Sequence, residues 1–313
     1  MGTLDRAIAD AAERTADSRD PAASSAARRV ANLAAFEFVR ELATDLSAST
    51  IELPSFPDIA FRLQKLLSEE GVSAEHVVRL LGAEPVLATR VLAMANSAAL
   101  NPGGKPATDL RAAVARLGFD ALRSVSVGFA LAQLRRAKAL AGIKRHLVVL
   151  WQHSVLVASL CFVLARRTHK VNPETAMLTG LVHGVGKLYI LTRSMRHPGL
   201  FGDPTTYQCI VRDWHSNIAK ALLESWFIAD EIVSAVSCYE DRARVLRGDG
   251  AVLADVLEIA DMLAMCKESP QLMRERLADC KAAAHLELDA DICLTLLAES
   301  ATELAALRSA LGQ

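Results

Sequence analysis

Apolar residues recur every three or four positions along most of the chain, with polar residues between them. After Pro57, the residues Ile59, Leu63 and Leu66 follow one face of a helix, and Gly71 is a natural stop. No segment shows a convincing strand pattern. The pattern therefore predicts an all-α protein built from many helices.

Residues that start helices stand between the apolar segments. Ser, Asp and Asn side chains accept hydrogen bonds from the first amide groups of a helix, and proline fits its first turn. The starting signals are Pro57, Ser73, Glu84-Pro85, Asp109, Asn172-Pro173 and Asp203-Pro204. Residues 1–50 predict one or two amphipathic helices, with Leu4 and Ile8 on the first and a break near Pro21. One last helix is predicted over residues 292–311.

The charged residues between Arg135 and Arg145 are typical of a solvated connection between two lobes. We therefore interpret the chain as a multi-helix bundle in two lobes with helical extensions at both ends. The predicted parts are an N-terminal extension (1–50), a domain (51–268) whose lobes cover about 51–140 and about 146–268, and a C-terminal extension (269–313).

One apolar stretch, residues 147–165, is long enough to suggest a membrane span. However, Gln152, His153 and Ser154 stand together inside it, and a spanning helix would place these polar groups in hydrocarbon at a high energetic cost. A helix buried in a protein core explains the same pattern. We therefore expect no membrane contact.

Composition narrows the class of protein further. Of 313 residues, 52% are hydrophobic and 23% charged, which is typical of a globular chain, and the net charge is −1. Because nucleic-acid binding depends largely on basic residues, this balance argues against a nucleic-acid partner, although it leaves a local basic patch open. Six cysteines without a C-x-x-C pair, and no apolar leader in residues 1–20, indicate free thiols in a cytoplasmic protein. The cysteines are Cys161, Cys209, Cys238, Cys266, Cys280 and Cys293.

The run Leu181-Val182-His183-Gly184-Val185-Gly186-Lys187-Leu188 resembles the central motif of the HD phosphohydrolase superfamily, in which an adjacent His and Asp at a helix end precede Ile-Gly-Lys. The resemblance implies that an earlier His and a later Asp join this pair around metal, and these correspond to His153 and Asp261. It also places Lys187 and His215 at positions often used for substrate or a second metal. Such donors suit a metal-activated water that attacks phosphorus.

The same resemblance contains a departure at its central position. Gly184 stands where the superfamily has the Asp, and glycine offers neither a ligand nor a charge. The double His of the cyclic-dinucleotide phosphodiesterase branch is also absent, because that stretch reads Cys238-Tyr239-Glu240. We therefore expect no catalytic residue, no cofactor and no metal. If an ion binds, His153, His183 and Asp261 would hold it.

Each of these residues also has a purely structural interpretation. His183 fits a hydrogen-bonded histidine at a helix end, and His153 fits a buried neutral residue bonded to the backbone or to Asp261. Lys187 fits a helix C-terminus or the surface, and His215 a half-exposed position near a helix start. Asp261 on an apolar helix needs a partner, because an unpaired buried carboxylate is costly.

Three segments of the first lobe resemble the HD-related output domain (HDOD) family, a non-catalytic branch of the same superfamily, over about residues 50–268. Two of these segments, residues 84–98 and 112–118, favour particular local structures. Asn96 is expected to fix the turn before Pro102, and Gly118 is expected to take a left-handed conformation at a helix end. Glu84-Pro85 departs mildly from the Asp-Pro that the family usually has. The segments are Leu53-Pro54-Ser55-Phe56-Pro57, residues 84–98 and residues 112–118.

The resemblance leaves three functions open. Members of the family occur in bacterial regulatory proteins, which implies a non-catalytic signalling module that acts through other signalling proteins or as a homodimer, with residues 1–50 as a candidate contact. The second function is a metal-dependent phosphohydrolase that uses His153, His183, Asp261 and His215. The third is a pseudoenzyme that binds a nucleotide or cyclic dinucleotide through Lys187, His215 and residues 242–247.

Overall fold

A computed structural model of the chain describes residues 21–48, 51–53, 57–101, 104–241, 243–244 and 249–311. Some features predicted from the sequence lie outside these residues. They are the helix carrying Leu4 and Ile8, the leader assignment for residues 1–20, Pro54-Ser55-Phe56, the turn at Pro102-Gly103, and the phosphate contacts of Arg242 and Arg247.

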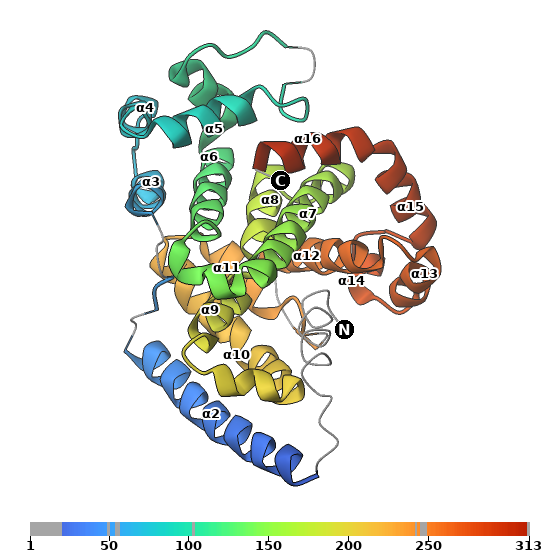
Figure 1. Cartoon of the computed structure of the whole chain (residues 1–313). Coiled ribbons are helices and arrows are strands. Elements are labelled where there is room, and N and C mark those ends of the chain that lie inside the picture. Colours follow the sequence, from blue (N-terminus) through green and yellow to red (C-terminus); the bar gives the residue numbers. More distant parts are fainter. Residues whose placement is uncertain are drawn as a thin grey trace.

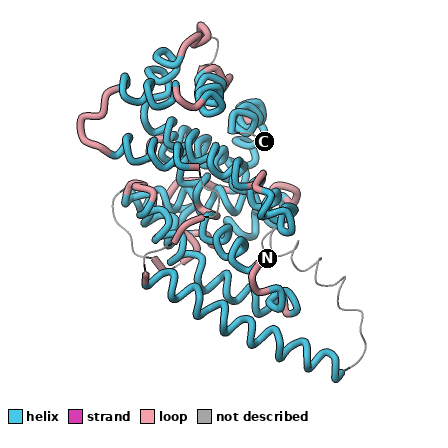
Figure 2. The backbone as a smooth tube through the Cα atoms, turned by 60° about the vertical axis from the view of Figure 1, so that its left-hand side comes forward, coloured by secondary structure: helices cyan, strands magenta, loops and turns pink. Residues whose placement is uncertain are grey.

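The described residues form helices joined by short loops, with no strand among them, which confirms the all-α prediction (Figure 2). In chain order, the first helices are α2 (Pro21–Ser47), α3 (Asp58–Ser68), α4 (Ala74–Gly82), α5 (Pro85–Ala95), α6 (Leu110–Leu134), the 3₁₀ helix η1 (Lys138–Ile143) and α7 (Lys144–Thr168). Then follow α8 (Pro173–Val182), α9 (Val185–Ser194), the 3₁₀ helix η2 (Pro198–Gly202), α10 (Pro204–Ser225) and α11 (Asp230–Cys238). The last are α12 (Asp249–Cys266), α13 (Pro270–Ala278), α14 (Lys281–His285), α15 (Ala290–Glu299) and α16 (Ala301–Leu311).

Most helix starts lie where the capping residues predicted them. The side chains of Ser73, Asp109, Asn172 and Asp203 each accept a hydrogen bond from an amide of the first turn. Pro57 is a small correction: it is the residue before α3 and not part of its first turn, because the helix begins at Asp58.

The long helix α6 connects the first lobe to the second. It packs against α3, α4 and α5 of the first lobe and also against α8 of the second lobe (Figure 1). At Gly118 the backbone has φ 70° and ψ 178°, which interrupts the helix and confirms that this glycine takes a positive φ. The Asn96 side chain fixes the preceding loop, since its oxygen accepts from the Ala107 amide at 2.7 Å and its nitrogen donates to the Ala107 carbonyl at 2.9 Å.

Helix α7 is the centre of the second lobe and packs against α8, α12 and α16. By length and composition it could cross a membrane, but 72% of its most apolar window is buried inside the protein. A core helix has this character. The connection before it is only partly solvated, because Lys138 and Arg145 are exposed while Leu140 and Ile143 are buried.

The N-terminal extension lies against the second lobe, where α2 packs on α10 and η2 (Figure 1). Phe38 and Leu42 of α2 are fully buried in this contact. Beside them, the Tyr189 hydroxyl donates to Asp45 at 2.6 Å, and Arg193 forms an ion pair with Asp45 at 3.0 Å. Apolar burial and ion pairs together therefore fix α2 to this lobe.

The prediction of one final helix over residues 292–311 is wrong. The chain forms α15 and α16 with Ser300 between them, and this break turns the chain so that α16 packs against α5, α6 and α7. Leu307 and Leu311 are buried in that contact, and Arg166 of α7 pairs with Glu303. The C-terminal helix therefore contacts both lobes.

We expect the substitution Gly118→Ala to lower the free energy of unfolding by about 1–3 kcal/mol, because alanine rarely adopts this backbone conformation. Gly82→Ala is the matched control, since a Cβ there meets no atom within 4 Å and the residue ends α4 at an ordinary φ. The control should be neutral or stabilising by up to about 1 kcal/mol. Urea unfolding measures both variants, and equal losses would show that Gly118 is not conformationally required.

Candidate functional site

Three of the side chains singled out in the sequence meet where α7, α8 and α12 pack together. His153 lies on α7, His183 directly after α8 and Asp261 on α12. Their ligand atoms all lie within 4.8 Å of one another, although His153 and Asp261 are 108 positions apart in the chain. The three residues that were matched to HD superfamily positions in the sequence therefore do lie together in the structure.

Hydrogen bonds orient both imidazole rings. The Nε2 atom of His153 lies 2.6 Å from the Asp261 carboxylate, so Asp261 has the partner that burial requires. The Nδ1 atom of His183 lies 2.6 Å from the Gly180 carbonyl, which can only accept. Nδ1 therefore carries the proton, and the Nε2 lone pair of neutral His183 is directed towards Asp261, 4.0 Å away.

Burial and charge set the protonation of this cluster. Burial lowers the pKa of His183 to about 4, and the charges of His153 and Lys187 act in the same direction, against the opposing effect of Asp261. Burial alone would raise the pKa of Asp261, but the hydrogen bond from His153 and the nearby positive charges outweigh it and lower that pKa. At neutral pH the cluster thus offers a neutral imidazole and a carboxylate, the forms in which these side chains bind metals.

The three donors fit one metal ion but not a pair of ions. A ligating histidine commonly donates its second ring nitrogen to a carbonyl, as His183 does to Gly180. The next donor of the superfamily is missing, because Gly184 has no side chain. A Cβ at Gly184 would lie 3.2 Å from Ser154 Oγ and 3.3 Å from a Leu150 methyl, so a larger residue requires a shift of a few tenths of an ångström.

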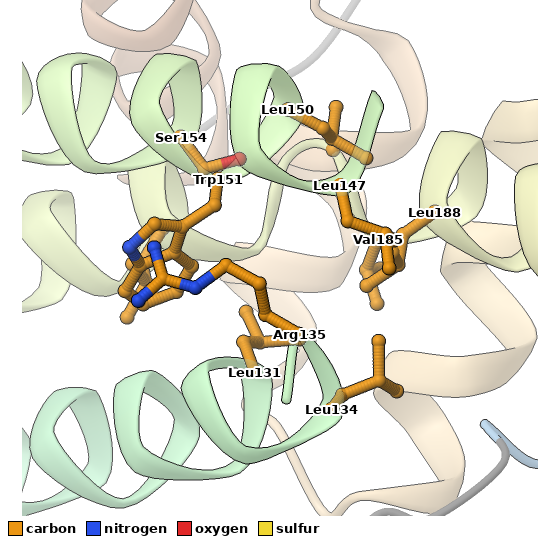
Figure 3. Close-up of a pocket in the computed structure, with 11 residues that line it drawn as sticks. Leu131, Leu134, Arg135, Leu147, Leu150, Trp151, Ser154, Val185 and Leu188 are labelled. Carbon is orange, nitrogen blue, oxygen red and sulfur yellow. The ribbon is translucent and has the colours of Figure 1, made fainter. Parts of the chain in front are cut away.

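Gly184 also lines a small cavity between α6, α7 and α9 (Figure 3). Arg135 and Trp151 lie on one side of it, with the guanidinium 5.7 Å from the indole ring centre, and leucine side chains close the other side. The cavity volume is about 20 Å³, roughly the space of one water molecule. The region beside Gly184 is therefore too small for a nucleotide.

The other two predicted site residues are joined by an acid that the sequence interpretation missed. Glu240 accepts from Lys187 at 2.7 Å and lies 3.0 Å from Nε2 of His215, and the Tyr239 hydroxyl also donates to it at 2.7 Å. Although burial opposes ionisation, the bond to His215 and the charge of Lys187 lower the pKa of Glu240. From the sequence, the stretch containing Glu240 indicated only that the two histidines are missing. An acid directly after the end of an apolar helix was the signal that could have pointed to Glu240.

Two structural interpretations of these residues are wrong. His215 is 2% exposed and not half-exposed, because α10 packs on α9 and α11 around it. Lys187 lies in the first turn of α9 and not at a helix C-terminus, because the new helix begins directly after Gly184.

A large cavity opens beside the cluster, with a volume of about 730 Å³. Asp261, His215 and Lys187 lie on its wall, and its lining mixes cations with acids. The loop cation Arg244 is already paired, at 2.5 Å with Asp255 and 2.7 Å with Glu258. The cavity is large enough for a nucleotide, but of the cations on its wall Lys187 is paired with Glu240 and Arg212 with Asp213. Other lining residues are Thr205, Gln208, Cys209, Arg212, Tyr239, Glu258, Met262, Met265 and Arg276.

We expect the pKa of His183 to make stability depend on pH. The folded-state pKa is below the ordinary value of 6.5, so the native state resists protonation and loses stability as pH falls from about 6.5 to about 4. The loss should reach about 3 kcal/mol and be absent in His183→Asn. Urea unfolding of chelator-treated protein at several pH values measures it. Parallel curves for the two proteins would refute the assignment.

Comparisons with known proteins agree with this fold. The chain adopts the fold of a protein from Shewanella amazonensis SB2B named provisionally as a metal-dependent phosphohydrolase, with a TM-score of 0.71 and 23% identity over 89% of this chain and 99% of that one. An HDOD domain protein of unknown function from Geobacter sulfurreducens has a TM-score of 0.60 and 23% identity over 87% of this chain and 97% of that one. A protein from Marinobacter aquaeolei VT8, named provisionally as a signal transduction protein, has a TM-score of 0.57 and 20% identity over 93% and 66%.

None of the curated proteins matches the chain in sequence. The family model of the HDOD domain matches residues 53–242, which leaves Asp261 and α12 beyond its end. The predicted domain limits of 51–268 and the two flanking extensions therefore stay predictions. Since the model covers more than half of the chain and agrees with the first-lobe motifs, the chain belongs to the HDOD domain family.

Proposed function

We propose that this chain is a non-catalytic signalling module that regulates other proteins by contact, on an HD scaffold that has lost its hydrolytic site. One observation carries the proposal: the central metal-ligand position is Gly184, and the charged groups around it are paired with one another. Asp261 is bonded to His153, and Glu240 is bonded to both Lys187 and His215.

Because the charged side chains in this region are paired with one another, a structural role is favoured over a catalytic one. A hydrolytic centre needs groups that change partners when substrate binds, and removing one partner of a buried pair leaves an uncompensated charge. Glu240 accepts three hydrogen bonds, from Lys187, Tyr239 and His215, so a phosphate would have to compete with it for the cations. This pairing makes the centre rigid, as expected of a scaffold.

A second candidate function is a metal-dependent phosphohydrolase with a single ion. The cluster of His153, His183 and Asp261 supports it, and the cavity of about 730 Å³ beside Asp261 gives a phosphoester room. A bound ion would supply an activated water. His183 and Asp261 would contribute a neutral nitrogen and a carboxylate, and Lys187 and His215 would need to leave Glu240 to bind phosphate oxygens.

The metal content of the purified protein separates these two functions. We expect wild type, prepared without an affinity tag, to contain no stoichiometric transition metal, and Gly184→Asp to gain about one ion per chain, because the new carboxylate completes the donor set. Gly184→Asn is the matched control, with the same size but no charge, and should stay empty. Elemental analysis measures all three proteins.

A stoichiometric metal in the wild type would overturn the proposal and favour the phosphohydrolase. Turnover of nucleotide phosphoesters with added Mn²⁺ would then be measured beside His183→Asn and Asp261→Asn. If Gly184→Asp folds and binds no more metal than Gly184→Asn, the correspondence of position 184 with the superfamily aspartate is itself wrong.

The surface of α2 supports a role in protein contact. Val30, Leu33 and Phe36 are 61%, 60% and 68% exposed and follow each other at helical spacing, while the opposite face of α2 is buried on the second lobe. The exposed side chains of Glu37 and Arg40 lie next to them and carry opposite charges. Two antiparallel copies of this surface would be complementary in both apolar and charged groups, so we propose a second copy of the chain as its partner.

We expect wild type to form a dimer whose fraction rises with concentration, and the double variant Leu33→Ser/Phe36→Ser to stay monomeric because it loses the apolar contact. Light scattering coupled to size-exclusion chromatography measures the molar mass. Thr44→Ala, an exposed position near the C-terminal end of α2, is the control and should still dimerise. A wild type that is monomeric at all concentrations would exclude a second copy as the partner.

A further inference from the structure

Three arginines gather where the first lobe meets the second. Arg90 comes from α5, while Arg135 and Arg136 follow the end of α6. Aromatic rings hold two of them in place: the guanidinium of Arg90 lies 5.9 Å from the ring centre of Phe129, and that of Arg135 lies 5.7 Å from Trp151 (Figure 3). These side chains are therefore ordered before any ligand arrives.

The three charges act on one another. Burial lowers the pKa of Arg90, and the charges of Arg136 and then Arg135 lower it further. Burial likewise lowers the pKa of Arg135, and Arg136 adds to the effect. Like charges that disfavour each other in this way destabilise the fold unless an anion offsets them.

The chain supplies little to offset them. Within the described part of the chain, no ion pair joins Arg90, Arg135 or Arg136 to a carboxylate. The C-terminal end of α6 carries roughly half a negative charge, which is too little for three guanidinium groups. Arg193 and Arg244, by contrast, each contact two acids.

A cavity of about 480 Å³ opens beside these arginines. Arg136, Lys138 and Gln133 supply its polar wall from the end of α6 and the start of η1, and Phe129 forms part of its lining under Arg90. Its other wall comes from the first lobe, with Pro57, Ile59 and the acid Glu84. Asp58, on the same stretch of α3, is paired with Arg62 at 3.9 Å.

We propose that this cavity at the end of α6 binds a phosphate-bearing small molecule of about nucleotide size, held by Arg136 and Lys138 of its wall, with Arg90 next to it over Phe129. Guanidinium groups bind phosphate oxygens in pairs, and the volume falls in the range of small-molecule sites. A ligand here would contact the residue before α3, α3 itself, the end of α6 and the start of η1 together. The site does not use the HD-like cluster and does not depend on what that cluster does.

A cavity with two cations on its wall, Arg136 and Lys138, fits a small molecule better than a nucleic acid. Binding a duplex or a strand needs basic groups spread along an extended surface to neutralise successive phosphates. The whole chain has a net charge of −1, and this cluster is local.

The test is calorimetric titration of the full chain with inorganic pyrophosphate. We expect wild type to bind, and Arg90→Gln and Arg136→Gln each to raise the dissociation constant by about tenfold or more, as the loss of one charge-assisted contact implies. Arg111→Gln is the matched control, since it removes an exposed arginine of the same lobe that is paired with Glu75, and its affinity should equal that of wild type. Lys187→Gln removes a cation of the HD-like centre and should also leave binding unchanged.

A second readout separates ligand binding from a structural role. Without pyrophosphate, Arg90→Gln and Arg136→Gln should melt at the same temperature as wild type or higher, because they relieve repulsion between like charges. Pyrophosphate should raise the melting temperature of wild type and Arg111→Gln but not of the two arginine variants.

Several outcomes would overturn the proposal. They are no binding of pyrophosphate to wild type, equal weakening by Arg111→Gln, and loss of binding in Lys187→Gln alone, which would place the ligand in the other cavity. Equal affinity for succinate would remove the assignment to phosphate. Tighter binding of a labelled oligonucleotide that is lost in the same arginine variants would replace the small molecule with a nucleic acid.

Discussion

The burial of α7 is the constraint on which the rest of the structure depends. Because this helix is packed against α8, α12 and α16, a polar side chain on its buried face is most stable when it finds a partner inside the protein. His153 finds Asp261 on α12, and this contact joins two helices that are far apart in the chain. The same contact brings His183 within 4.0 Å of the carboxylate, so the packing of α7 also creates the cluster of potential ligands.

At the centre of the second lobe, His153, His183 and Asp261 are arranged as the ligands of a metal site are. Side chains there are also hydrogen-bonded to one another, as in a structural core. Gly180 orients His183 as a carbonyl orients a ligating imidazole, while Gly184 removes the carboxylate that would complete the set. Glu240 meanwhile binds both Lys187 and His215.

The arginines near the end of α6 have different neighbours from those of the second lobe. Arg193 and Arg244 contact acids, whereas Arg90 and Arg135 lie over aromatic rings. The end of α6 thus carries charge that no ion pair among the described residues offsets, and α16 packs against α5 and α6 on one side and α7 on the other.

The sequence by itself determined the all-helical fold and most helix starts, because caps and glycines act over a few residues: Asp109 starts α6, and Gly118 interrupts it. The motif resemblance also identified the three residues of the cluster, since their spacing reflects one shared fold. Only the tertiary structure decided what those residues contact. Glu240 was missed as the partner of His215, and the break at Ser300 was not foreseen, because both depend on how distant helices pack and not on local preference. The gathering of the three arginines has the same origin, as Arg90 meets Arg135 and Arg136 only where α5 lies against α6.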